Sequence, residues 1–91
     1  MERIKHVAPE NDYRVRITFE TGDIVSVDFR PVIERGGRFA KLGDQQTFQQ
    51  VAIGEYGRYI EWPGGIDFCA DALRLGLGDS YSVPSNKVAN A

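Results

Sequence analysis

The chain is poor in the residues that build disulfides, metal centres and catalytic triads. It contains one cysteine, Cys69, and one histidine, His6, far apart in the sequence. A single cysteine forms no internal disulfide, and zinc sites need several cysteine or histidine ligands at short spacings. No nucleophile lies beside the histidine in sequence. We therefore predict a reducing compartment, no metal, no cofactor and no enzymatic activity.

Long apolar runs and a strong charge of one sign are missing too. No stretch approaches the roughly 18 apolar residues of a membrane span. The opening MERIKHVAPE carries charges where a secretory signal needs its apolar run, so we expect a cytoplasmic protein. The formal net charge is −2, from 13 acidic and 11 basic residues. This balance gives nucleic-acid binding no support, although Arg14 and Arg16 could form a local patch on one strand face.

Two alternating segments predict the first hairpin. Residues 13–19, YRVRITF, and residues 24–29, IVSVDF, each alternate apolar and polar side chains. Their apolar sets share a face only if the loop has an odd number of residues, which selects Glu20-Thr21-Gly22 with Gly22 in the left-handed conformation. The register then pairs Val15 with Val27, Ile17 with Val25, and Arg14 with Asp28.

The middle of the chain predicts short helices and a second hairpin. Residues 31–35 can form one helical turn before Gly36-Gly37 ends it, and Asp44 can cap a turn that points Phe48 inward. A four-residue loop, Gly54–Gly57, would connect two strands with a common apolar face: Val51, Ile53, Ile60 and Trp62. The imperfectly alternating residues 3–8 are expected to form an edge strand.

The stretch WPGGIDFCAD, residues 62–71, predicts a structural corner. Pro63 and Gly65 would turn the chain, and Asp67 would cap a short helix formed by FCADALRL. Trp62 either anchors the core, which its apolar face favours, or serves as a partner hot spot. Cys69 is expected to be a small buried hydrophobe, with a reactive thiol as the alternative.

Together these elements predict an α+β domain over residues 1–78. We expect a small, mainly antiparallel sheet of four or five strands with one short C-terminal helix. The polar residues 79–91 have little periodicity and are expected to form a flexible tail.

Several motifs in order resemble the bacterial domain-of-unknown-function family 2442. They are F-x-x-G (Phe19, Gly22), V-D-F (residues 27–29), F-x-x-L-x-D (residues 39–44) and W-P-x-G-x-D (residues 62–67). The resemblance covers most of residues 4–75. It implies no activity and no residue roles. Some members of the family resemble the first half of proteins that end in a helix-turn-helix DNA-binding domain, and others are encoded next to small toxin-like proteins. This chain lacks the proline that usually follows the corner.

These observations predict a non-catalytic interaction module that binds itself or a genetically linked small protein. The surface would be a sheet edge or exposed groups near the corner. Candidate partner-binding residues are Tyr56, Trp62, Arg14 and Arg16.

Two alternatives remain open at this point. The first is a small-ligand or enzymatic site using Asp28, Asp67 or Asp71, although helix capping also explains Asp67 and Asp71. The second is a DNA-binding regulator that contacts phosphates through Arg14 and Arg16.

Overall fold

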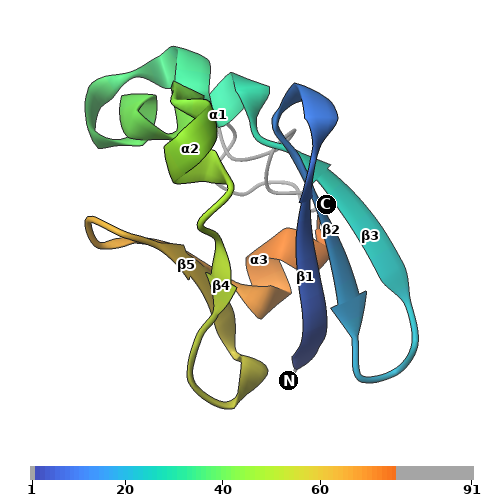
Figure 1. Ribbon diagram of the computed structural model, residues 1–91. Helices are drawn as coiled ribbons and strands as arrows, with labels where there is room; N and C mark the ends of the chain where they lie inside the picture. Colours follow the sequence, from blue (N-terminus) through green and yellow to red (C-terminus); the bar gives the residue numbers. More distant parts are fainter. Residues whose placement is uncertain (1, 76–91) are drawn as a thin grey trace.

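The computed structural model describes residues 2–75, which form two three-stranded antiparallel sheets joined by short helices (Figure 1). The first sheet consists of β1 (Ile4–Glu10), β2 (Arg14–Phe19) and β3 (Ile24–Asp28), in that order. The second consists of β4 (Ala52–Ile53), β5 (Tyr59–Trp62) and β6 (Ile66–Cys69). The predicted α+β class is confirmed, but the strands form two small sheets instead of one.

Short helical segments connect the two sheets. They are α1 (Arg30–Arg35), the 3-10 segment η2 (Gly37–Gly43) and α2 (Gln45–Phe48), with α3 (Ala70–Arg74) following the second sheet. Gly36, with φ of 80°, ends α1 as predicted. The predicted cap on α2 is confirmed, because Asp44 Oδ2 accepts a hydrogen bond from the Thr47 N–H at 3.0 Å. Two further 3-10 turns are η1 (Asn11–Tyr13) and η3 (Glu55–Gly57).

The β2–β3 hairpin has the predicted register. Val15 pairs with Val27, Ile17 with Val25, and Arg14 with Asp28. The Phe19 N–H donates to the Asp23 carbonyl at 2.9 Å, which leaves Glu20, Thr21 and Gly22 as the loop. Gly22 has φ of 96°, in the left-handed region that glycine enters without strain. β1 occupies the predicted edge beside β2.

The β4–β5 hairpin turns one residue later than predicted. The Gly54 N–H donates to the Tyr59 carbonyl at 2.7 Å, so the loop contains residues 55–58 instead of 54–57. Ile53 pairs with Ile60, which keeps both on the predicted apolar face. The shift occurs because η3 forms a tight turn at Glu55, with Tyr56 and Gly57 both at positive φ.

The predicted corner is instead a third hairpin, β5–β6. Trp62 pairs with Ile66 across a three-residue loop, and Glu61 pairs with Asp67. Asp67 is therefore a strand residue, and its predicted role as a helix cap is wrong. Helix α3 begins at Ala70, and Cys69 precedes it. Alternation along β6 turns Phe68 inward and leaves Cys69 exposed, so the prediction of a buried Cys69 is also wrong.

An aromatic cluster fills the space between the sheets and the helices. Trp62 is 3% exposed, and its ring centroid lies 5.2 Å from that of Phe29. Its indole Nε1 donates to the buried Phe48 carbonyl at 2.9 Å. The largest fully buried side chains are Phe19, Phe29, Phe48, Ile17, Leu42, Ile60, Ile66, Leu73, Val15, Val27 and Val32. The core therefore draws on both sheets and on all three α-helices or their connections.

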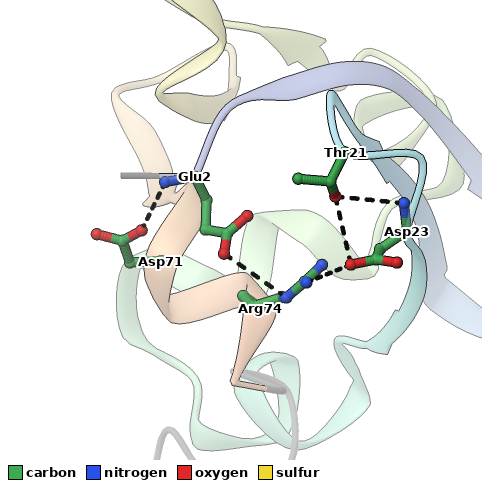
Figure 2. A network of polar contacts seen from close by, with 5 residues as sticks. All are labelled: Glu2, Thr21, Asp23, Asp71 and Arg74. Atoms are coloured by element: carbon green, nitrogen blue, oxygen red, sulfur yellow. Dashed lines mark hydrogen bonds and ion pairs between the residues drawn. The ribbon is translucent and has the colours of Figure 1, made fainter.

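Polar contacts attach α3 to the first sheet (Figure 2). The Arg74 guanidinium forms an ion pair with Asp23 at the end of the β2–β3 hairpin, and its Nε lies 3.7 Å from Glu2 Oε2. The guanidinium carbon is also 4.9 Å from the centre of the Phe19 ring. The N-terminal segment also contacts this hairpin, because the Glu20 N–H donates to the Arg3 carbonyl at 2.9 Å.

The predicted flexible tail, residues 79–91, and the proposed domain boundary at 78 lie outside the described residues. Within residues 2–75, no helix is long and apolar enough to span a membrane.

Candidate functional site

The outer face of the first sheet carries the two arginines that were candidates for partner or DNA binding. Arg16 forms a salt bridge with Glu10 at 2.8 Å. Arg14 pairs in register with Glu10 on β1 and with Asp28 on β3. Because carboxylates lie on both sides of these arginines, this face alternates in charge and does not resemble a phosphate-binding patch.

Asp28 has a stronger partner than the predicted Arg14. Arg30 Nη2 lies 2.8 Å from Asp28 Oδ2, and the Arg30 backbone N–H donates to Asp28 Oδ1 at 2.9 Å. The hydrogen bond from the Arg30 side chain is the main cause that lowers the pKa of Asp28, while burial opposes it. Asp28 therefore stabilises the start of α1, and it is an ion-paired structural residue.

The second sheet carries an open depression of about 390 Å³ on its outer face. We call it the Asp67 depression, and its lining residues are Glu2, Arg58, Tyr59, Asp67, Cys69, Ala70 and Asp71. Strand pairing explains its composition, because Tyr59 lies opposite Cys69 and Glu61 lies opposite Asp67 on the outward side of β5 and β6. The depression brings together Asp67 and Asp71 of the sequence prediction, whereas Asp28 lies on the other sheet.

Some charged side chains of the Asp67 depression have a partner within the protein and others do not. Asp71 Oδ1 accepts a hydrogen bond from the Glu2 backbone N–H at 3.2 Å, and the Glu2 carboxylate faces Arg74 (Figure 2). Within residues 2–75, the side chains of Arg58 and Asp67 have no hydrogen-bond or ion-pair partner. A ligand or partner could therefore contact one cation and one anion without displacing an existing contact.

Tyr56 is the most unusual exposed side chain near this depression. It is 71% exposed and adopts φ of 60°, in the left-handed region that residues with a Cβ rarely enter. It lies in the η3 turn, two residues before Arg58, whose backbone N–H closes the turn on the Glu55 carbonyl at 3.2 Å. The ring contributes neither to the core nor to a favourable backbone conformation.

Trp62, the other aromatic candidate, is part of the core. Its burial and its hydrogen bond to the Phe48 carbonyl leave no ring surface for a partner. This is the reading that its apolar neighbours favoured. Pro63 and Gly65 belong to the β5–β6 turn, where Gly64 and Gly65 have φ of 96° and 81°. Of the corner residues, only Asp67 contributes to the depression.

Sequence reasoning missed Glu2, Arg58 and Tyr59 as members of this surface. Tyr59 and Arg58 could have been found by pairing β5 with β6, since that register places Tyr59 opposite Cys69. Glu2 has no local signal, because its contacts with Asp71 and Arg74 join residues far apart in the sequence. Within residues 2–75, no three histidine, cysteine, aspartate or glutamate side chains are grouped so as to hold a metal ion.

The fold and this surface define a small α+β domain of two three-stranded sheets with a mixed-charge depression on one of them. The family model described as "Protein of unknown function (DUF2442)" matches residues 4–77, and the chain belongs to this family. The match confirms the resemblance drawn from the motifs. No curated protein and no solved structure matches the chain.

Proposed function

We propose that the domain is a non-catalytic module that binds another protein through Tyr56 and the adjoining Asp67 depression. The observation that carries this proposal is the state of Tyr56: a large aromatic side chain held exposed in the left-handed backbone region. This backbone conformation costs a residue with a Cβ atom about 1–2 kcal/mol, a cost that glycine does not have. The Tyr56 ring is not part of the core, which supports a role in binding.

The chemistry of the surface suits a protein segment. Tyrosine presents a large, rigid contact area with a polar tip, which makes it a common binding hot spot. In the Asp67 depression, Arg58 and Asp67 offer one unpaired charge of each sign, while Glu2 and Asp71 add negative charge. We expect a partner that places an apolar group on Tyr56 and a basic side chain near Asp67.

Substitution of Tyr56 by glycine tests this proposal sharply. The partner is first captured with the full chain from a lysate of the source organism, identified by mass spectrometry and then purified. Tyr56→Gly removes the ring and relieves the backbone strain, so the free energy of unfolding should change by no more than about 1 kcal/mol. The affinity for the purified partner should fall at least tenfold.

A matched control is Leu75→Ser, because Leu75 is 73% exposed but does not line the depression. Its affinity for the partner should equal that of the unaltered chain. Equal binding by the unaltered chain and Tyr56→Gly would contradict the proposed surface. Failure to recover any stoichiometric protein would contradict the proposed function itself.

The Asp67 depression also supports a second candidate, the binding of a small cationic ligand. The supporting observation is that Asp67 and Asp71, predicted as a possible acid pair, both line it. A thermal-shift screen with small amines and guanidines tests this candidate. Stabilisation that Asp67→Asn abolishes, with no effect of Tyr56→Gly, would favour a small ligand over a protein partner.

A further inference from the structure

The free edge of β3 differs from the other strand edges among residues 2–75. β1 has a register irregularity between Ile4 and His6, contains Lys5 and Pro9, and packs against β4. β4 contains two residues, and β6 contains four, one of which is the charged Asp67. Bulges, lysine, proline, short length and charge are the usual protections of an edge strand.

Within Ile24–Asp28, β3 has no bulge, lysine or proline, and its one charged residue is the last, Asp28. It is a regular five-residue strand with unbroken pairing to β2, and it forms the outer edge of its sheet (Figure 1). Its first residue, Ile24, is β-branched and 62% exposed. An unprotected edge of this kind is a template for strand addition.

The hydrogen-bond pattern shows which peptide groups are free. The Phe19 N–H donates to the Asp23 carbonyl and the Phe29 N–H donates to the Tyr13 carbonyl, both at 2.9 Å. Bonded pairs alternate along an antiparallel ladder, so Val25 and Val27 also bond to β2. The peptide groups of Ile24, Ser26 and Asp28 therefore point away from β2.

We infer that β3 pairs with β3 of a second copy of this chain, antiparallel and centred on Ser26. A two-fold axis requires the antiparallel direction and presents the same residues from both copies. Centring at Ser26 pairs Ser26 with Ser26 and Ile24 with Asp28 of the other copy. Of the registers that use the outward-pointing groups, this one pairs all three residues, with two backbone hydrogen bonds in each pair.

The side chains of β3 agree with this register. The sequence Val25-Ser26-Val27 is symmetric about Ser26, so Val25 of one copy faces Val27 of the other on the inner side of the joined sheet. On the outer side, Ile24 faces the Asp28–Arg30 ion pair of the other copy, whose arginine has an aliphatic stem. The small, exposed Ser26 side chain lies on the axis without crowding.

No residue of β3 lines the Asp67 depression, so the proposed dimer uses different residues from the proposed partner site. This inference is thus independent of the proposed partner site, and the two can fail separately. Substitutions on β3 should change self-association without changing the affinity for a protein that binds at Tyr56.

The first test compares Ser26→Lys with Ser26→Ala by analytical ultracentrifugation of the full chain over a wide concentration range. The unaltered chain and Ser26→Ala should reach twice the 10.2 kDa chain mass. Ser26→Lys brings two ammonium groups together at the axis and should remain monomeric, with an unchanged circular dichroism spectrum. A monomeric unaltered chain, or a Ser26→Lys variant that dimerises equally well, would overturn the inference.

The second test fixes the register and does not depend on the lysine variant folding. In a Cys69→Ser background, Ser26→Cys should form a covalent dimer on mild oxidation, because hydrogen-bonded partners have Cα atoms about 5.5 Å apart, within disulfide range. Ile24→Cys should not, since the two Ile24 Cα atoms would be about 15 Å apart. Cross-linking of Ile24→Cys as fast as Ser26→Cys would overturn the proposed pairing.

Discussion

Arg74 of α3 and Asp23 of the β2–β3 hairpin form an ion pair across 51 positions of sequence (Figure 2). The hydrogen bond and charge of Arg74 lower the pKa of Asp23 from its ordinary value of 3.8, with a smaller contribution from Thr21. The pair joins the last described helix to the first sheet. It therefore couples the protonation of one exposed carboxyl group to the attachment of α3 to the β2–β3 hairpin.

The pH dependence of this coupling follows from the direction of the shift. Because the pKa of Asp23 is lower in the folded state, its contribution to stability is present above 3.8 and is lost as the pH falls through the folded pKa. A double-mutant cycle of Asp23→Asn and Arg74→Gln, followed by denaturant unfolding, should show favourable coupling at pH 7. The coupling should vanish below the folded pKa. A coupling that does not depend on pH would contradict this account.

Gly57 lies in the η3 turn, where the backbone of the β4–β5 hairpin comes close to the backbone of β1. A Cβ atom placed there would lie 2.5 Å from the Ile4 carbonyl oxygen, and the residue has φ of 70°. Gly22 has φ of 96° but open space around it. Gly22→Ala should cost about 1–2 kcal/mol of unfolding free energy from backbone strain alone. Gly57→Ala should cost more, because β1 must also move.

Urea unfolding followed by circular dichroism compares the two variants directly. Gly22→Ala serves as the control, because its added Cβ strains the left-handed backbone but contacts no neighbouring atom. If the two substitutions cost the same, the approach of η3 to β1 would not constrain the packing of the sheets.

The hairpins show how far sequence reasoning reaches in this chain. The β2–β3 register follows from alternation and an odd loop, and both are local properties of residues 13–29. The same arithmetic applies to Trp62, Pro63-Gly64-Gly65 and Ile66, which form the β5–β6 hairpin. It was missed because an aspartate after two glycines also matches a helix start, and four residues are too few for periodicity to distinguish strand from helix.

The candidate surface was less predictable than the fold. Tyr56 was identified from its place in a loop, but its left-handed backbone has no sequence signal at a tyrosine. The Asp67 depression depends on a backbone contact between Glu2 and Asp71, which are 69 residues apart. The division into two sheets likewise depends on long-range packing of β1 against β4, which no local pattern specifies.

Trp62 should contribute strongly to stability through both its ring and its Nε1 donor. Trp62→Phe keeps an aromatic ring but leaves the Phe48 carbonyl without its 2.9 Å hydrogen bond and creates a void. An unsatisfied buried polar group costs about 1–3 kcal/mol, and lost packing adds to this. Urea unfolding monitored by circular dichroism should show the loss. Tyr59→Phe, at a half-buried residue of the outer face, is the control and should be nearly neutral.

Cys69 should react with a thiol reagent in the folded protein, because alternation along β6 exposes it in the Asp67 depression. Labelling with a small maleimide should reach one equivalent without denaturant, and the circular dichroism spectrum should not change. A helical Cys69 packed in the core would instead react only after unfolding, so slow, unfolding-limited labelling would contradict the β6 assignment. If the proposed partner occupies the depression, adding it at a concentration near its Kd for the unaltered chain should protect Cys69 much more in that chain than in Tyr56→Gly. Equal protection of Cys69 in both chains would show that the partner covers the depression without using Tyr56.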